Sequence, residues 1–213
     1  MTTPQSRSRM PADDRRRQLV GIGLRMLTER PIQELSIDQV AAAAGISRGL
    51  LFHYFPNKRA FYVAVVRAAA RRMLRECEPD PEAPPRRQLE QMLTGYLGFL
   101  ERRRDPYVAL FRGTAGGADY VREIYEETRD AFTRRALHAL GLDAPTPLVV
   151  LAVRAWFCFV EDAALSWTVE RPVERDALVA VLVSSLDALV TAAEAGTTPQ
   201  GTAPQRVTPS APR

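Results

Sequence analysis

Cysteine and histidine are scarce in this sequence. Its 213 residues include two cysteines, Cys77 and Cys158, and two histidines, His53 and His138. Two cysteines are too few for a disulfide framework or a cysteine-rich zinc cluster. No motif joins a nucleophile to a general base. We therefore expect no resident metal, no cofactor and no enzymatic activity.

Long apolar runs are also lacking. Residues 1–18 are polar, without the apolar core of a signal peptide. The most apolar run, Leu148 to Val160, is interrupted by Arg154, and it is shorter than the ~20 residues that span a bilayer. The composition, 46% hydrophobic and 25% charged, is ordinary for a globular chain. We expect a soluble, cytoplasmic protein of one or two domains without a membrane partner.

Lysine is nearly absent, because Lys58 is the only one and the other basic residues are arginines. The formal net charge is +4, but it is unevenly distributed. Residues 1–60 hold ten basic and five acidic side chains, whereas residues 61–213 hold nineteen basic and twenty acidic ones. A basic excess confined to the N-terminal part indicates contact with a polyanion.

The pattern of apolar residues predicts an all-α fold of about nine helices, since no stretch alternates as a strand does. The first helix begins near Asp13 and stops before Pro31. The others are expected at 37–44, 48–54, 58–75, 86–103, 106–112, 118–140, 147–170 and 173–194. Residues that favour helix ends support these bounds: Ser36, Ser47 and Thr146 as N-caps, Pro147 and Pro172 at first turns, Gly141 and Gly196 at C-terminal ends.

Residues 35–66 contain the most specific motif. A short helix, a turn with Gly45 and a second short helix follow one another at helix-turn-helix spacing. In that motif the second helix enters the major groove of DNA while the first crosses the backbone. Val40, Ala41 and Ala44 are small enough for the two helices to cross closely. Ser36, Ser47 and Lys58 stand at helix starts, where free N–H groups favour a phosphate.

The run from Ala44 to Lys58, AGISRGLLFHYFPNK, resembles the signature of the TetR (tetracycline-repressor-like) transcriptional regulators, and LSIDQVA at 35–41 resembles their second helix. Phe52 replaces a frequent Tyr, and Arg59 replaces a frequent acidic residue. The resemblance implies a DNA-binding domain, at 13–60, and a helical ligand-binding and dimerisation domain, at 61–195. Composition predicts a flexible basic arm at 1–12 and a disordered tail rich in Pro, Thr and Gln at 196–213.

Carried over to this sequence, the resemblance implies roles for individual residues in binding double-stranded DNA at a palindromic operator. His53, Tyr54 and Lys58 would hold phosphates, together with the helix start at Ser36. Ser47, Arg48, Gly49 and Leu50 would face base edges, with Arg48 pairing with guanine and Leu50 contacting a thymine methyl. Ser47 is expected to cap its helix as well.

The C-terminal half is expected to provide a homodimer interface and a ligand pocket. Helices near 147–170 and 173–194 are apolar on several sides, and the resemblance implies that they form the dimer interface. Candidate pocket residues are aromatic: Tyr96, Phe99, Tyr107, Phe111, Tyr120, Tyr125, Trp156, Phe159 and Trp167. Each of them is also suited to plain core packing. Without a clear basic cluster in this half, we expect a small, largely apolar effector.

Two acidic residues in the apolar 147–170 helix have two interpretations. Glu161 and Asp162 either pair with Arg154 or Arg112, which we favour, or contact a polar group of the ligand.

The sequence thus predicts a sequence-specific, homodimeric repressor that its effector releases from DNA. Alternatives are a ligand-promoted repressor or an activator of the same family, and a non-specific architectural DNA-binding protein.

Overall fold

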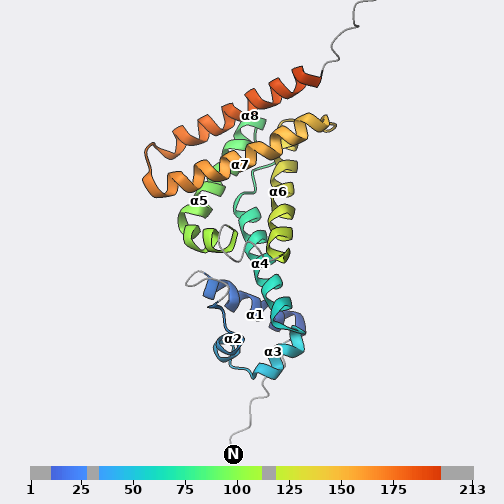
Figure 1. Ribbon diagram of the computed structural model, residues 1–213, viewed down its shortest axis with the longest axis vertical. Helices are drawn as coiled ribbons and strands as arrows, with labels where there is room; N and C mark the ends of the chain where they lie inside the picture. The colour runs from blue at the N-terminus through green and yellow to red at the C-terminus, as the bar shows by residue number, and fades with distance from the viewer. Residues whose placement is uncertain (1–10, 28–33, 112–118, 198–213) are drawn as a thin grey trace, which may run out of the picture.

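The structure, a computed structural model, describes residues 11–27, 34–111 and 119–197. Over these ranges the chain forms eight helices and no strand, which confirms the all-α fold. The molecule is elongated, with α1, α2 and α3 at one end, α7 and α8 crossing the other, and α4 running between them (Figure 1). The helices are α1 (Ala12–Leu27), α2 (Ile37–Ala43), α3 (Arg48–Tyr54), α4 (Lys58–Glu76), α5 (Pro85–Phe111), α6 (Asp119–Ala139), α7 (Pro147–Glu170) and α8 (Arg175–Thr197).

Helix α5 joins two helices that the sequence predicts separately, at 86–103 and 106–112. The two parts meet at a kink where Arg103 leaves helical geometry, with φ −142° and ψ 30°. Pro106 explains the kink, because its ring clashes with the carbonyl four residues earlier and its nitrogen has no hydrogen to donate. The kink turns the last part of α5 towards α1 and α4.

Most of the expected helix ends are confirmed. Ser36, Ser47 and Thr146 accept hydrogen bonds from the first turns of α2, α3 and α7. Gly141 follows α6 with φ +70°, a conformation that glycine adopts without strain. Asn57 is the N-cap of α4: its Oδ1 accepts from Ala60 N at 2.8 Å.

One expected helix start is wrong. Pro172 does not begin the last helix, because Arg171 takes a left-handed conformation (φ 45°) after α7 and α8 starts at Arg175. Gly196 lies in the last turn of α8, next to its final residue Thr197, as expected within the usual uncertainty of helix bounds.

Buried side chains form two clusters. The first combines α1, α2, α3 and the start of α4 with Leu110, Val121 and Ile124 from the body helices. The second fills the space between the end of α4 and helices α5 to α8. Phe111 packs against both clusters, and α4 is continuous from one to the other. We refer to α1–α3 with the start of α4 as the head and to the rest as the body.

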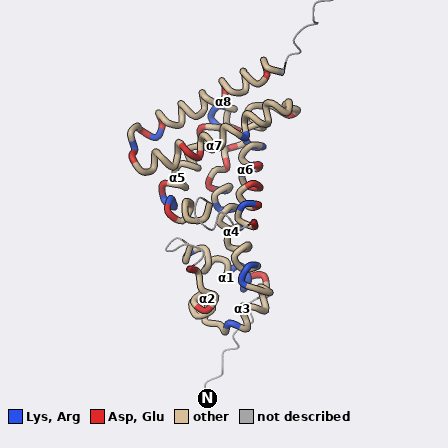
Figure 2. The backbone as a smooth tube through the Cα atoms, viewed as in Figure 1, with Lys and Arg blue, Asp and Glu red and all other residues tan. Residues whose placement is uncertain are grey.

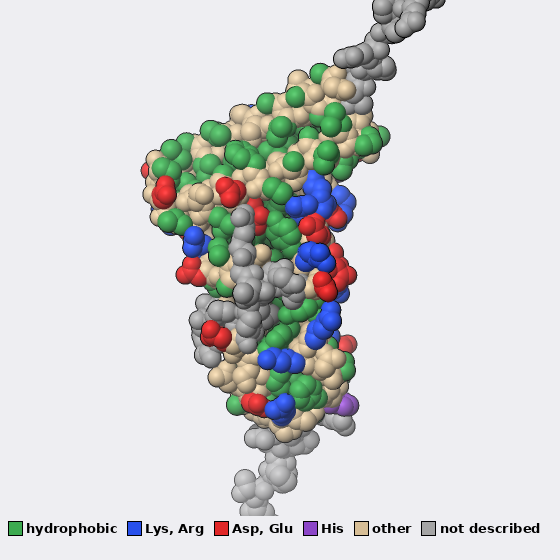
Figure 3. Space-filling model, in the orientation of Figure 1, with side chains coloured by type: hydrophobic (Ala, Val, Ile, Leu, Met, Phe, Trp, Pro, Cys, Tyr) green, Lys and Arg blue, Asp and Glu red, His purple; other side chains and the backbone are tan. Residues whose placement is uncertain are grey.

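Helices α7 and α8 expose an apolar surface at the end of the body opposite the head. Figure 2 shows few charged residues along either helix, and Figure 3 shows hydrophobic side chains gathered over both. Large exposed apolar residues of these helices and the turn between them are Leu148, Val150, Leu151, Phe159, Val169, Val173, Val181 and Leu189. The segment Arg175–Gly196 is even long and apolar enough to cross a membrane by length and composition, but Leu182, Val183 and Leu186 bury one face of it in the body core.

Candidate nucleic-acid interface and body cavity

Helices α2 and α3 form the expected helix-turn-helix. Gly45 in the turn has φ +64°, and the N–H groups of Gly45 and Ile46 return to the carbonyls of Ala42 and Ala41, each at 3.0 Å. These hydrogen bonds satisfy carbonyl groups in the last turn of α2, and the chain changes direction within a few residues. Leu51 and Phe55 on the inner side of α3 are buried in the head. Burial of Leu51 and Phe55 determines which face of α3 points to the solvent.

The outward face of α3 carries the residues expected to contact DNA. Ser47, Arg48, Gly49, Leu50 and His53 are exposed, and Tyr54 is half-buried. Leu50 is 40% exposed and is the one large exposed apolar residue of the described head. Ser47 combines exposure with capping, because its Oγ accepts from Leu50 N at 3.2 Å. The structure therefore brings these residues together on one surface.

Arg48 at the start of α3 is oriented by two neighbours. Its Nη1 lies 3.3 Å from Asp38 Oδ2 on α2, and its guanidinium lies over the Phe52 ring at 5.5 Å from the centroid. Both Arg48 and Asp38 are well exposed, so the ion pair itself adds little stability. Its effect is to restrict a flexible side chain before it meets a partner. Sequence reasoning missed Asp38, although it follows the cap residue Ser36 by only two positions.

A second group of expected DNA contacts lies around the start of α4. Lys58 is exposed, and its Nζ lies 5.1 Å above the ring of Tyr62. The Tyr62 hydroxyl donates to the carbonyl of Leu35, just before α2. His53 and Tyr54 make an edge-to-face ring contact at 5.3 Å. Ser36 is half-buried and accepts from Asp38 N. The arm residues 1–10 lie outside the described residues.

A cavity of about 60 Å³ lies where the head meets the body. Head helix α1 and the body helices α4 and α5 all line it. Its walls are mainly apolar: Leu24, Leu27, Ala69, Ala70, Met73, Phe99, Pro106, Tyr107, Leu110 and Phe111, with Arg72 and Arg103 as the charged members. Of the nine expected pocket residues, the cavity brings together Phe99, Tyr107 and Phe111. Sequence reasoning missed the two arginines and the α1 leucines.

The other expected pocket residues lie elsewhere. Trp156 is buried between α7 and α8, where its Nε1 donates to the Leu182 carbonyl at 3.0 Å. Trp167 is also buried and donates to the Val173 carbonyl. Phe159 is 47% exposed on the α7–α8 surface. Tyr120 packs against the head cluster.

Tyr96 and Tyr125 belong to a buried polar network centred on Glu161, which is 3% exposed. The hydroxyls of Tyr107 and Tyr125 donate to its two carboxylate oxygens, the latter at 2.7 Å. Tyr96 in turn hydrogen-bonds the Tyr107 hydroxyl at 3.2 Å. Burial raises the pKa of Tyr96 and Tyr107 well above the ordinary value, so both hydroxyls remain donors. The network joins α5, α6 and α7.

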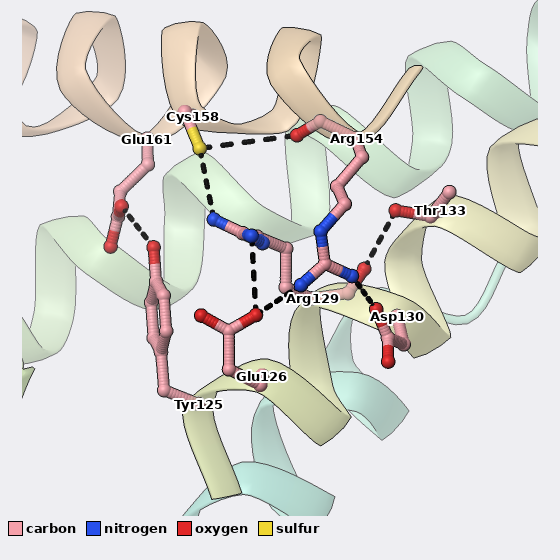
Figure 4. A network of polar contacts seen from close by, with 8 residues as sticks. All are labelled: Tyr125, Glu126, Arg129, Asp130, Thr133, Arg154, Cys158 and Glu161. Carbon is pink, nitrogen blue, oxygen red and sulfur yellow. Dashed lines mark hydrogen bonds and ion pairs between the residues drawn. The ribbon is translucent and has the colours of Figure 1, made fainter. Parts of the chain in front are cut away.

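The expected pairing of Glu161 or Asp162 with Arg154 is wrong. Arg154 instead binds Glu126 and Asp130 of α6, because it emerges from the side of α7 that faces the acidic positions of that helix (Figure 4). Arg129 completes this seam: it lies 3.1 Å from Glu126 and donates to Cys158 Sγ at 3.2 Å. Arg112, the other expected partner, lies outside the described residues.

Comparisons with known proteins agree with this architecture. Residues 22–65 match the family model of bacterial regulatory proteins, tetR family, and residues 85–195 match the tetracyclin repressor-like, C-terminal domain. The HTH-type transcriptional activator FasR of Mycolicibacterium smegmatis is 24% identical over 188 residues, 81% of either chain. The HTH-type transcriptional regulator EthR of the same organism is 30% identical over 97 residues, 41% of this chain and 45% of EthR. A tetR-family regulator from Streptomyces coelicolor superposes with a TM-score of 0.74 and 31% identity, covering 88% of this chain and 85% of that one.

A helix-turn-helix head carried on a helical body defines a DNA-binding transcriptional regulator. The matched family models and the similarity along most of the chain show that it belongs to the TetR family.

Proposed function

We propose that this regulator is a homodimeric repressor that a small, largely apolar effector releases from a palindromic operator. The observation that carries the proposal is the cavity at the junction of head and body, since Leu24 and Leu27 of α1 line it together with α4 and α5. A ligand bound there contacts both parts of the molecule. It can therefore favour one orientation of the head over another.

The DNA contacts would come from the outward face of α3 and the start of α4. Arg48 and Leu50 would meet base edges, with Ser47 and Gly49 allowing close approach. His53, Tyr54, Lys58 and the helix start at Ser36 would hold phosphates, which position the head without reading sequence. Their grouping on one exposed surface supports this assignment. We retain residues 13–60 as the DNA-binding domain and 61–195 as the ligand-binding and dimerisation domain.

The apolar surface of α7 and α8 would form the dimer interface. Contiguous exposed apolar patches of this kind mark association sites, and Leu151 and Val181 are about 60% exposed on it (61% and 59%). Two heads at a fixed separation are what a palindromic operator requires. Leu151→Glu should convert the dimer to a monomer in light scattering, whereas Glu123→Gln, an exposed position on α6 outside this surface, should leave it dimeric.

Repression would be relieved by a change in the spacing of the two heads. The effector would bind more tightly to a body conformation in which the two heads are wrongly spaced for the operator. The loss of operator affinity then equals the difference in effector affinity between the two conformations, typically about 1–3 kcal/mol. No catalytic step is required, and we propose no enzymatic activity. The protein would act in the cytoplasm, on chromosomal DNA.

An activator of the same family is the second candidate, because FasR, which aligns over 81% of the chain, is named a transcriptional activator. Deleting the gene and measuring transcription beside the operator separates the two. Higher transcription in the deletion strain supports the repressor, whereas lower transcription supports the activator.

The operator itself is obtained by selecting DNA from a random pool with the purified protein. An inverted repeat with fixed half-site spacing supports the sequence-specific dimer. Selected DNA that shares only its base composition, together with a binding constant that falls steeply with salt, would instead support an architectural DNA-binding protein.

A further inference from the structure

Three arginines converge beside the cavity at the junction of head and body. Arg72 comes from α4, and Arg102 and Arg103 come from the kink of α5. All three bind the same carboxylate, that of Glu76: the distances are 2.8 Å from Arg72, 2.6 Å from Arg102 and 3.2 Å from Arg103. Three positive charges thus share one negative charge. Among the described residues this leaves a local excess of two positive charges, from Arg72 and from Arg102 and Arg103, which follow it 30 and 31 positions later.

The geometry of the kink brings this charge to the cavity. Arg103 is the residue with non-helical φ and ψ in α5, and its side chain is 16% exposed. Its guanidinium lies over the Phe99 ring at 4.8 Å, and both residues line the cavity. Arg72 faces the same cavity from α4. Within the part of the chain that the structure describes, the charged residues in the cavity wall, Arg72 and Arg103, are therefore both cations.

The titration of the cluster agrees with a surplus of positive charge. Burial raises the pKa of Glu76, but hydrogen bonds from Arg72 and Arg102 and the charge of Arg103 outweigh it and hold the pKa below its ordinary value. Burial lowers the pKa of Arg103, a cost that Glu76 only partly offsets. A second anion would compensate the remaining charge.

Apart from Tyr107, whose hydroxyl donates to Glu161, the rest of the cavity wall formed by described residues is apolar. Leu24 and Leu27 from α1, Met73 from α4, and Leu110 and Phe111 from α5 enclose it beyond the arginines. An occupant that satisfies both parts of this wall needs an acidic group at one end and a hydrocarbon part at the other. Its present volume of about 60 Å³ holds only a few methylene groups, so a longer chain would have to separate α1 from α5.

We propose that the effector is an amphipathic anion, an alkyl carboxylate or alkyl phosphate, whose acidic group binds Arg72 and Arg103 while its hydrocarbon part enters between α1, α4 and α5. The inference rests on the effector site of the proposed function and adds an acidic group to the small, largely apolar effector expected from the sequence. Arg102 and Arg103 are neighbours in the sequence, but only the packing of α4 against the kink brings Arg72 to them.

The test compares three ten-carbon probes by calorimetry at pH 7.5: sodium decanoate, decyl phosphate and 1-decanol. We expect the two anions to bind the dimeric protein at least about tenfold more tightly than the alcohol, as charge-assisted hydrogen bonds imply. The ratio of the affinities for decanoate and decyl phosphate shows whether the site prefers a carboxylate or a phosphate. Arg103→Gln should remove the advantage of the anions and leave the affinity for 1-decanol within about twofold.

Two further variants guard against a folding effect of Arg103→Gln. Arg72→Gln changes a half-exposed side chain, 46% exposed, and should weaken anion binding in the same direction. Arg87→Gln is the matched control, because Arg87 pairs with Glu90 near the start of α5 and does not line the cavity. It should bind all three probes as the parent protein does.

Equal affinity for decanoate and 1-decanol would overturn the inference, as would anion binding that both arginine variants leave unchanged, or no binding of any probe. Operator binding, measured by fluorescence anisotropy with the same probes, reports separately on the proposed function. If 1-decanol alone releases the DNA, the proposed effector-controlled regulation is supported and the anion site is contradicted. If decanoate binds in an arginine-dependent way but does not release the DNA, the anion site is supported and the proposed effector-controlled regulation is contradicted.

Discussion

The head and the body use polar side chains in opposite ways. In the head, Arg48, Asp38 and Lys58 are exposed, and their partners lie within ten residues along the chain. In the body, Glu161 is buried and receives hydrogen bonds from Tyr107, 54 residues away, and Tyr125, 36 residues away. The exposed polar groups of the head are therefore positioned by neighbours in the sequence, whereas the buried polar groups of the body hold α5, α6 and α7 together. Changes to Arg48 and Lys58 should therefore affect DNA binding, whereas changes to the hydrogen bonds of Glu161 should affect folding.

The strongest test of this contrast is a pair of glycines. A Cβ at Gly95 of α5 would lie 2.3 Å from the backbone oxygen of Glu76, whereas at Gly21 of α1 it would meet nothing within 4 Å. Gly95→Ala should lower the free energy of unfolding by about 3 kcal/mol, because neither backbone can give way. Gly21→Ala should raise it by up to about 1 kcal/mol. Urea unfolding at one protein concentration measures both, and equal effects would contradict the close contact of α4 and α5.

The next largest effect is expected from two buried tyrosine hydroxyls. Tyr107→Phe removes the donor to the buried carboxylate of Glu161 and should cost about 2–3 kcal/mol of unfolding free energy. Tyr62→Phe in the head removes a donor to the neutral carbonyl of Leu35, so it should cost about 1 kcal/mol. Urea unfolding compares the two. The contrast between head and body would fail if Tyr62→Phe proved the more damaging change.

Arg48 should determine sequence preference rather than stability. Arg48→Ala should weaken operator binding by about 1–3 kcal/mol and relax the preference at one base pair, while unfolding changes by less than ~0.5 kcal/mol. Asp38→Asn keeps the arginine and removes the carboxylate that orients it, so it should relax the same base pair to a smaller extent. Competition between operator variants measures both. An unchanged base preference in Arg48→Ala would refute its assignment as a base-reading residue.

Lys58 should produce the smallest and least specific effect. Lys58→Ala should weaken binding to all sequences alike, and it should reduce the salt slope of the binding constant by about one per head. Titrations of operator and random DNA at several salt concentrations measure the slope. Arg87→Gln, on the body, is the control and should change neither quantity. A loss limited to the operator would show that Lys58 does not act through phosphates.

The sequence was most informative where a structural role depends on neighbouring residues. Ser36, Ser47 and Thr146 could be predicted as N-caps because each bonds an N–H only two or three residues ahead. The turn at Gly45 and the outward face of α3 followed from the same short-range pattern. Pro106 signalled an interruption of α5, but not whether the helix would end or bend there.

Roles that depend on distant residues could not be predicted. Nine aromatic residues fitted a pocket equally well by composition, and three of them line the cavity. The sequence also offered Arg154 as one of two partners for Glu161 or Asp162, whereas Arg154 turns to α6. Spacing along one helix says which residues share a face, but not which helix that face meets.

By itself the sequence determined the helical fold, the helix-turn-helix and the outward residues of α3, because helical periodicity, capping and turn chemistry act over a few residues. Only the tertiary structure decided that Arg72, Arg102 and Arg103 surround Glu76, that the α1 leucines line a cavity with α5, and that Glu161 is held by tyrosines. These arrangements depend on how α4, α5, α6 and α7 pack, and packing is settled by the shape of whole helix faces rather than by any local pattern.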